Sequence, residues 1–234
     1  MEKEYENNMN GLSSKQNLGL WLDLRLSNKA MNYLWDIIDI PTETQEERNC
    51  KNILVGNISK SHWIDDTKDN WLYDNILKHS AETLFFQDWN NYYNVHISKK
   101  IRPPKFKLTE MWVNYQKQHE FNPPHYHAGT FSFVIFMKIP THWKEQHALP
   151  ISGNSNSPNA SDFQFLTPGP GAIVDDVSLP LSPEDEGRML FFPAAVTHQV
   201  FPFYGTEKER ITVGGNVFFE SAKAETRKFD NYRR

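Results

Sequence analysis

Cysteine is nearly absent from this sequence of 234 residues: Cys50 is the only one, so no disulfide bond can form within the chain. Such cysteine usage fits a reducing compartment. No apolar run approaches the roughly 20 residues that a membrane-spanning helix needs. Residues 1–16 are polar, unlike a secretory signal peptide. We therefore expect a cytoplasmic protein without a membrane partner.

An excess of positive charge is lacking as well, since 25 Lys and Arg residues stand against 29 Asp and Glu, for a net charge of -4. Nucleic-acid-binding proteins typically carry a basic face, and the few basic stretches here are short. The composition therefore gives no sign of a nucleic-acid partner. Aromatic residues are plentiful at 14%, so the chain can bury a substantial core rather than stay disordered.

The composition divides the chain into four predicted parts. They are a polar leader (1–16), a helical N-terminal region (17–104), a strand-rich core (105–220) and a charged C-terminal tail (221–234). In the helical region, Ser27 is a suitable N-cap, because apolar residues recur after it at helical spacing until Pro41 interrupts the pattern. A second helix is predicted over residues 70–78.

The strand-rich part consists of short apolar or alternating runs separated by Pro, Gly, Asn and Asp. Helices first and strands later indicate an α+β protein rather than a parallel βαβ sheet. A jelly roll is the most economical arrangement of about eight short strands, and we expect the N-terminal helices to pack against it. The Ser- and Asn-rich stretch 152–162 is predicted to be a loop, either a lid or a plain insertion. The predicted strands are 106–115, 131–139, 163–166, 171–174, 189–192, 199–203 and 211–219.

Two histidines one residue apart mark the most informative segment, Asn122-Pro-Pro-His-Tyr-His-Ala-Gly. On a strand, His125 and His127 would point to one face, so both imidazoles could bind the same ion. Imidazole suits Fe, Zn, Ni or Cu. A third histidine, His198, follows an apolar run, where a hydrogen-bonded core histidine is the common alternative to a metal ligand.

The segment 209–217 indicates a carboxylate pocket, because Arg210 and Thr212 share one strand face with Gly214 and Asn216. The planar guanidinium group can bind a carboxylate with two parallel hydrogen bonds. The alternative is a surface strand that begins with a solvated arginine. If the residues around Gly205 form a hairpin turn, antiparallel pairing places His198 beside Arg210.

Together, these motifs resemble those of the 2-oxoglutarate/Fe(II) oxygenase superfamily, in which H-x-H or H-x-D precedes a distal His and then Arg-x-Ser/Thr. The similarity is greatest to the prolyl-hydroxylase-like group, especially oxygenases from phage and bacterial genomes, and it covers about residues 105–220. The matching residues are Trp112-Val-Asn114, His125-Tyr-His127, Phe192-Pro193, His198, Arg210-Ile-Thr212 and Asn216.

The resemblance implies a double-stranded β-helix, which is a jelly roll, with Fe(II) at its open end. It implies a dioxygenase that uses O2 to hydroxylate a small-molecule or protein substrate while converting 2-oxoglutarate to succinate and CO2. If the gene is a phage gene, the location is the cytoplasm of the host cell. The metal ligands implied are His125, His127 and His198. The residues implied for the cosubstrate are Arg210, Thr212, Asn114, Asn216 and Tyr115.

Two positions depart from the usual family pattern and keep other functions open. His127 stands where the superfamily usually has a carboxylate, as in three-histidine dioxygenases that use no keto acid. Phe136 stands where related enzymes often have a Tyr that contacts the cosubstrate, and Tyr115 is its candidate replacement. The alternatives are a cupin-like three-histidine metalloenzyme that does not use 2-oxoglutarate and a non-catalytic β-sandwich phage protein. The resemblance specifies neither the substrate nor the oligomeric state.

Overall fold

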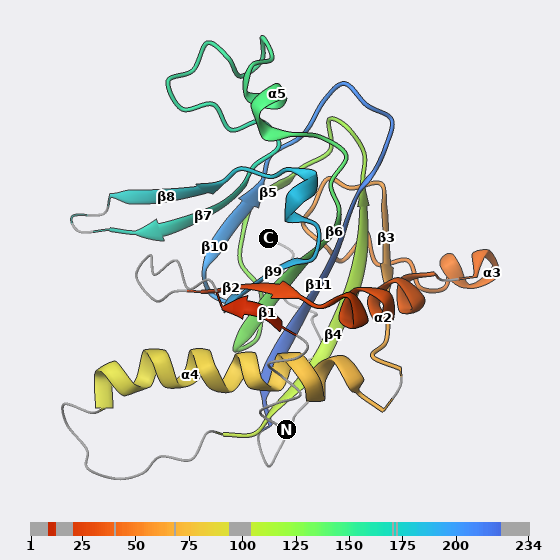
Figure 1. The fold of residues 1–234 in the computed structure, drawn as a ribbon, viewed down its shortest axis with the longest axis vertical. Coiled ribbons are helices and arrows are strands. Elements are labelled where there is room, and N and C mark those ends of the chain that lie inside the picture. Colours follow the sequence, from red (N-terminus) through yellow and green to blue (C-terminus); the bar gives the residue numbers. More distant parts are fainter. Residues whose placement is uncertain are drawn as a thin grey trace.

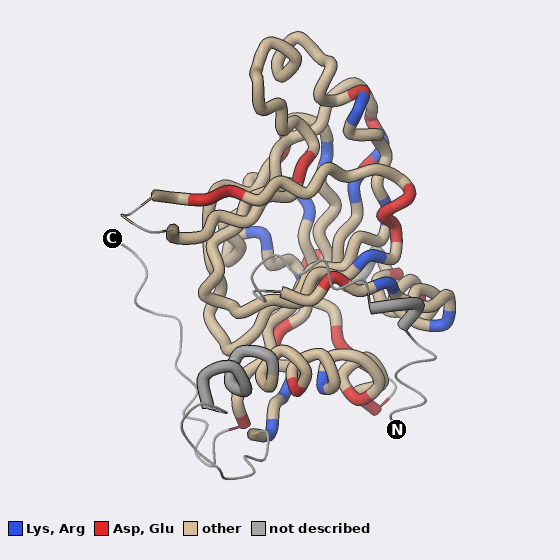
Figure 2. Tube along the Cα trace, turned by 60° about the vertical axis from the view of Figure 1, so that its left-hand side comes forward, with Lys and Arg blue, Asp and Glu red and all other residues tan. Residues whose placement is uncertain are grey.

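The structure is a computed structural model that describes residues 9–12, 21–39, 41–67, 69–93, 104–169, 171 and 173–220. Two antiparallel β-sheets dominate it, one of seven strands and one of four (Figure 1). Residues from both sheets line one cavity between them, as in a jelly roll. Basic and acidic residues are interspersed along the described part of the chain (Figure 2).

The seven-stranded sheet has the order β1-β2-β9-β6-β11-β4-β3. Val213 and Val217 of its strand β11 belong to the larger hydrophobic cluster, whereas Arg210 and Thr212 line the cavity. The alternation predicted for this strand is therefore confirmed. The strands are β1 (Met9–Leu12), β2 (Leu22–Leu26), β3 (Lys60–Trp63), β4 (Phe106–Gln116), β6 (Phe131–Lys138), β9 (Arg188–Pro193) and β11 (Arg210–Phe219).

The four-stranded sheet has the order β5-β10-β7-β8. Two of its strands lie several residues from their predicted positions: the strand expected over 171–174 is β8, and that expected over 199–203 is β10. Gly and Pro residues in these stretches indicate turns, but they allow the ends of the strands to be predicted only approximately. The strands are β5 (Asn122–His125), β7 (Phe163–Pro168), β8 (Val174–Leu179) and β10 (Thr197–Val200).

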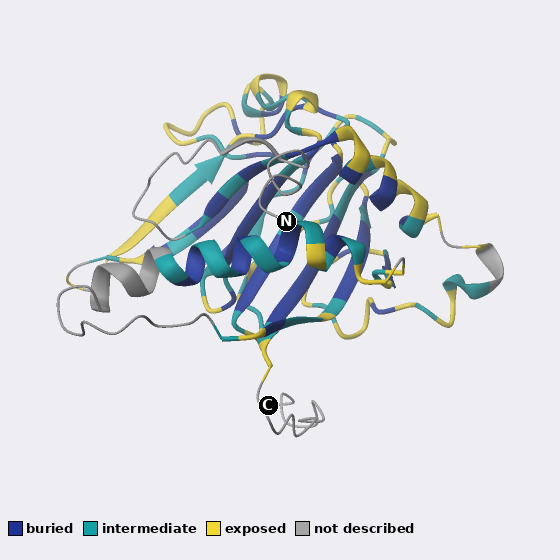
Figure 3. Ribbon diagram, turned by 60° about the horizontal axis from the view of Figure 1, so that its bottom comes forward, coloured by how far each residue is buried: buried dark blue, intermediate teal, exposed yellow. Residues whose placement is uncertain are grey.

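The first long helix, α2, begins where the sequence predicts, because the side-chain Oγ of Ser27 accepts a hydrogen bond of 3.2 Å from the backbone N–H of Ala30. Leu34 of α2 and Leu84 of α4 belong to the same hydrophobic cluster as Val213 of the large sheet. Figure 3 shows α4 running across one face of the buried strands. The helices are α2 (Asn28–Ile38), α3 (Thr42–Gln45), η1 (Tyr73–Leu77), α4 (Lys78–Tyr93), α5 (Trp143–His147) and η3 (Pro183–Asp185).

No helix in the described ranges is both long and apolar enough to cross a lipid bilayer.

The N-terminal region is not purely helical, contrary to the prediction, since β2 pairs with β9 and β3 pairs with β4. In β2, Leu22, Leu24 and Leu26 are buried and alternate with polar residues, which is the period of a strand rather than a helix. Part of the predicted leader forms β1, which pairs with β2. The rest of the leader and the tail 221–234 lie outside the described residues.

Candidate metal centre

Three histidines from different parts of the chain meet in the cavity between the two sheets. One ring nitrogen from each of His125, His127 and His198 lies within 4.8 Å of the other two. The ring centroids are 5.0 Å apart for His125 and His127, 4.3 Å for His125 and His198, and 5.1 Å for His127 and His198. Imidazole nitrogens at this spacing can bind a single metal ion.

The three histidines reach this cluster by different routes. His125 is the last residue of β5, and His198 lies opposite it on β10 in the antiparallel register. His127 lies two residues beyond the end of β5, where its backbone N–H donates a 2.9 Å hydrogen bond to the carbonyl oxygen of Ala194. The same-face argument from the sequence therefore fails for His127, although its side chain still joins the cluster.

Backbone carbonyls fix the orientation of two of the rings. Nδ1 of His125 lies 2.7 Å from the oxygen of Pro123, and Nδ1 of His198 lies 3.1 Å from the oxygen of Val196. Because a carbonyl oxygen only accepts, these Nδ1 atoms carry the proton, and each Nε2 keeps a free lone pair.

Burial also favours the neutral form of all three imidazoles. Desolvation lowers the pKa of His127 to about 3, with a further contribution from neighbouring His125. It lowers the pKa of His125, and it lowers that of His198 well below the usual value, with the other two histidines adding to the effect. Three neutral imidazoles are a donor set that suits Fe(II), so the residues present fit the metal.

Arg210, the predicted cosubstrate anchor, is fully buried. One terminal nitrogen, Nη2, donates to the backbone oxygen of Ser161 at 2.8 Å and to its Oγ at 2.5 Å. Nη1 and Nε are buried without any hydrogen-bond partner in the described protein. Desolvation lowers the pKa of Arg210 to about 10, whereas the negative charge of Asp162 acts to raise it. The guanidinium group is therefore still a cation at neutral pH. Two unpaired donors on a buried cation suit a carboxylate.

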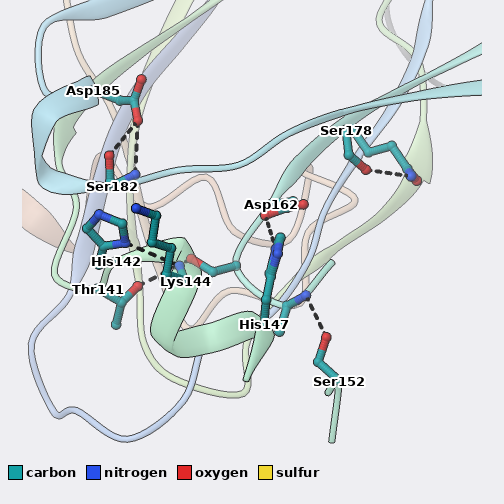
Figure 4. A network of polar contacts seen from close by, with 12 residues as sticks. Thr141, His142, Lys144, His147, Ser152, Asp162, Ser178, Ser182 and Asp185 are labelled. Atoms are coloured by element: carbon teal, nitrogen blue, oxygen red, sulfur yellow. Dashed lines mark hydrogen bonds and ion pairs between the residues drawn. The ribbon is translucent and has the colours of Figure 1, made fainter. Parts of the chain in front are cut away.

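The loop 152–162 anchors this arginine, which the sequence did not reveal. Its residues Ser152, Ser161 and Asp162 are buried. An oxygen of Asp162 lies 2.8 Å from Nε2 of His147 in α5 (Figure 4). Burial raises the pKa of Asp162, whereas His147 and Arg210 oppose this shift. No local motif marks these residues, because Ser161 and Arg210 are 49 positions apart.

Three other residues predicted for the cosubstrate line the same cavity, namely Asn114, Thr212 and Asn216. The Oδ1 atom of Asn114 accepts a 2.7 Å hydrogen bond from the hydroxyl of Ser61. The Oδ1 atom of Asn216 accepts one of 2.6 Å from the hydroxyl of Ser132. These contacts hold both amide groups in place at the wall of the cavity. Their roles toward a cosubstrate remain predictions.

Tyr115 was assigned wrongly, because it does not line the cavity. Its hydroxyl donates a 3.1 Å hydrogen bond to the backbone oxygen of Ile38 in α2, and its ring packs against the larger hydrophobic cluster. Successive residues of a strand point to opposite faces, so Tyr115 cannot share the cavity face with Asn114. Phe136 does line the cavity, and Tyr115 does not replace the hydrogen bond that a Tyr at that position would make.

The predicted hairpin between His198 and Arg210 is also wrong. Strand β10 pairs with β5 and β7, whereas β11 pairs with β4 and β6. The intervening residues 201–209 carry the chain from one sheet to the other, so His198 and Arg210 line the cavity from opposite sides. The cavity has a volume of about 220 Å³, and its walls also include Trp63 and Glu110, which the sequence analysis did not select as site residues.

A three-histidine cluster and a buried arginine in the cavity of a jelly roll define a candidate non-haem metal site with an anion anchor. Residues 110–216 match the model of a family described as "Putative 2OG-Fe(II) oxygenase". This part of the chain thus carries the pattern of the 2OG-Fe(II) oxygenase family, and the resemblance to that superfamily drawn from the motifs is confirmed. The family description implies Fe(II), 2-oxoglutarate and O2. No curated protein matches the chain.

Several solved structures are similar to this chain at low sequence identity. The non-heme alpha ketoglutarate dependent carbocyclase SnoK from nogalamycin biosynthesis has a TM-score of 0.53 at 9% identity, over 90% of this chain and 87% of that one. A Pseudomonas putida prolyl-4-hydroxylase has a TM-score of 0.48 at 15% identity, over 86% and 93%. The viral collagen prolyl hydroxylase of Paramecium Bursaria Chlorella virus-1 has a TM-score of 0.42 at 11% identity, over 85% and 95%. The likeness to SnoK supports the jelly-roll fold and no more.

Proposed function

We propose that this protein is a 2-oxoglutarate- and Fe(II)-dependent dioxygenase in which His125, His127 and His198 bind the iron and Arg210 binds the cosubstrate. The observation that carries the proposal is the presence, in one cavity, of the three-histidine cluster and a buried arginine whose Nη1 and Nε lack partners. A cupin-like three-histidine enzyme without a keto acid would have no need for this arginine.

Iron bound at the cluster would supply O2 chemistry, in which one oxygen atom goes to succinate as 2-oxoglutarate loses CO2 and the other hydroxylates a substrate C–H bond. The protein's own contribution is to position the reactants. Arg210 binds the distal carboxylate of the keto acid through its two free donors, in a buried site where such a pair is strong. Asn114 and Thr212 provide polar groups along the same walls, whereas Asn216 lines the cavity farther along β11, where it donates a hydrogen bond to Glu110.

The test begins with metal analysis of protein purified without added metal, followed by reconstitution with Fe(II). We expect one iron ion to bind per chain. Aerobic preparations can instead contain Ni or Zn, which bind such sites more tightly than Fe(II) does. Anaerobic titration of 2-oxoglutarate into the Fe(II) protein should produce a metal-to-ligand charge-transfer absorption band. In air, the same protein should form succinate.

The outcomes separate the alternatives. Iron binding without any binding of 2-oxoglutarate would favour the cupin-like metalloenzyme. Absence of metal binding would favour the non-catalytic β-sandwich.

A further inference from the structure

We infer that the cavity contains a subsite for a positively charged ammonium group of the substrate, formed by Glu110, Trp63 and Trp112. The inference deepens the proposed function, because a group bound at this subsite would lie beside the histidine cluster. It names the chemistry of the substrate, which neither the family nor the fold specifies.

Glu110 supplies the negative charge of this subsite. It is half-buried, and within the described ranges it is the only carboxylate that lines the cavity. Its Oε2 accepts a 2.7 Å hydrogen bond from Nδ2 of Asn216, which fixes the carboxylate in place. No Lys or Arg among the described residues forms an ion pair with it. A carboxylate that is held in place, faces the cavity and has no cationic partner among the described residues is available to a cationic ligand.

Trp63 and Trp112 supply two aromatic walls. They lie opposite each other on the paired strands β3 and β4, and both line the cavity. Their ring centroids are 6.0 Å apart, and the ring planes form an angle of 84°. Aromatic rings and a carboxylate that line one cavity can bind an ammonium group together, since the ring faces carry negative electrostatic potential.

The position of Trp112 is fixed by the neighbouring strand. Its indole lies against Gly214 of β11, where an added Cβ would come within 3.0 Å of the indole Nε1, Cε2 and Cζ2 atoms. Any larger residue at position 214 would displace the ring. The glycine therefore lets the indole lie close to the sheet, with its ring held in a defined orientation.

This subsite adjoins the metal cluster and lies far from the cosubstrate anchor. The ring centroids of Trp112 and His127 are 5.5 Å apart. Glu110 lies opposite Asn216, six positions along β11 from Arg210, which corresponds to roughly 20 Å of extended strand. The distal carboxylate of the cosubstrate and the ammonium group of the substrate would thus bind at positions well separated along β11, each against a charge of opposite sign.

Binding can be measured separately from catalysis with simple probes. We would titrate butyltrimethylammonium and butylammonium into the full-length iron-free protein labelled with 15N, and follow the indole N–H signals of its 7 tryptophans. Replacement of Trp63 or Trp112 by Phe assigns their two signals. Butanol, which is neutral, and butyrate, which is anionic, serve as the matched comparison probes.

We expect both ammonium probes, but neither butanol nor butyrate, to shift the signals of Trp63 and Trp112. Glu110→Gln keeps the acceptor for Asn216 and removes only the charge, so it should weaken ammonium binding about tenfold, as for loss of one charge-assisted contact. Glu47→Gln, which removes a charge from an exposed site, is the matched control and should bind like the wild type. Equal shifts with butanol, or unchanged affinity in Glu110→Gln, would overturn the inference.

Two further arms separate this inference from the proposed function. Ammonium binding in a protein that never binds 2-oxoglutarate would support the subsite and reject the dioxygenase. If the dioxygenase is active, free amines and lysine-containing peptides are compared as stimulators of succinate formation. Norleucine peptides, which lack the ammonium group, are the control for the lysine peptides. If both stimulate succinate formation equally, the ammonium group is not recognised, and this would count against the subsite.

Discussion

The two sheets contribute different chemistry to one cavity. The four-stranded sheet contributes His125 and His198, which burial keeps neutral. The seven-stranded sheet contributes Glu110 and Arg210, the two side chains of fixed charge that line the cavity in the part of the chain that the structure describes. His127 comes from the turn that connects the sheets.

The difference indicates a division of roles, in which one sheet binds the metal and the other recognises charged ligands. Neutral imidazoles suit metal binding because protonation would compete with the ion. Fixed charges at a cavity wall suit ligands of opposite charge. If the division holds, a substitution on one sheet should change metal content, and a substitution on the other should change ligand affinity alone.

The largest effect is expected for His198→Ala on the four-stranded sheet. Loss of a residue that only orients a metal ligand typically lowers metal affinity by about 10–100-fold. Loss of a ligand itself should therefore lower the affinity by more than about 100-fold. Elemental analysis of the reconstituted protein measures this effect, and circular dichroism checks that the fold is kept. Full iron occupancy in His198→Ala would show that the histidine cluster is not the metal site.

Arg210→Ala should weaken 2-oxoglutarate binding while leaving the iron content unchanged. Removal of one partner of a buried ion pair typically costs about 3–5 kcal/mol, which corresponds to about 10²–10³-fold in affinity. Arg210→Lys should be milder, because it retains the charge but loses the planar fork. Anaerobic titration of the Fe(II) protein gives both affinities. Equal affinity in the wild type and Arg210→Ala would refute this role.

His127 tests the boundary between the two sheets. His127→Asp would restore the common two-histidine, one-carboxylate set and should keep the iron. His127→Ala should reduce iron retention by about tenfold, less than His198→Ala, since water can occupy the vacant position. Iron content measured after dialysis distinguishes these cases. If neither substitution alters it, His127 is not a ligand.

The smallest effect is expected at Ser161, whose side chain orients Arg210. Ser161→Ala removes the hydroxyl that accepts one hydrogen bond from the guanidinium but leaves the backbone carbonyl oxygen, which accepts the other. A net loss of about 1 kcal/mol corresponds to about fivefold weaker binding of 2-oxoglutarate. Ser157→Ala, at an exposed position of the same loop, is the control. Unchanged cosubstrate affinity in Ser161→Ala would mean that Arg210 needs no such support.

Much of the strand-rich core was predictable because its signals are local. The period of two in β11 correctly separated Arg210 and Thr212 from Val213 and Val217. The N-cap at Ser27 gave the start of α2. In contrast, β2 was missed although its leucines alternate, because a strand of five residues offers few positions for a pattern.

The errors at the site have a common cause, which is the assumption that residues near in sequence are near in space. His198 and Arg210 are near in sequence but line the cavity from different sheets. Tyr115 adjoins Asn114 but points to the opposite face. Ser161, which contacts Arg210, is distant in sequence and had no recognisable motif.

The sequence by itself determined which residue types are present for the chemistry: the three histidines, the arginine and the alternation that places the arginine on the inner face of its strand. These follow from side-chain chemistry and from the period of a strand, both of which are local. Only the tertiary structure decided which side chains share the cavity. Glu110, Trp63 and Ser161 join the site through pairing of strands and packing of a loop across long stretches of sequence, and such contacts leave no local pattern.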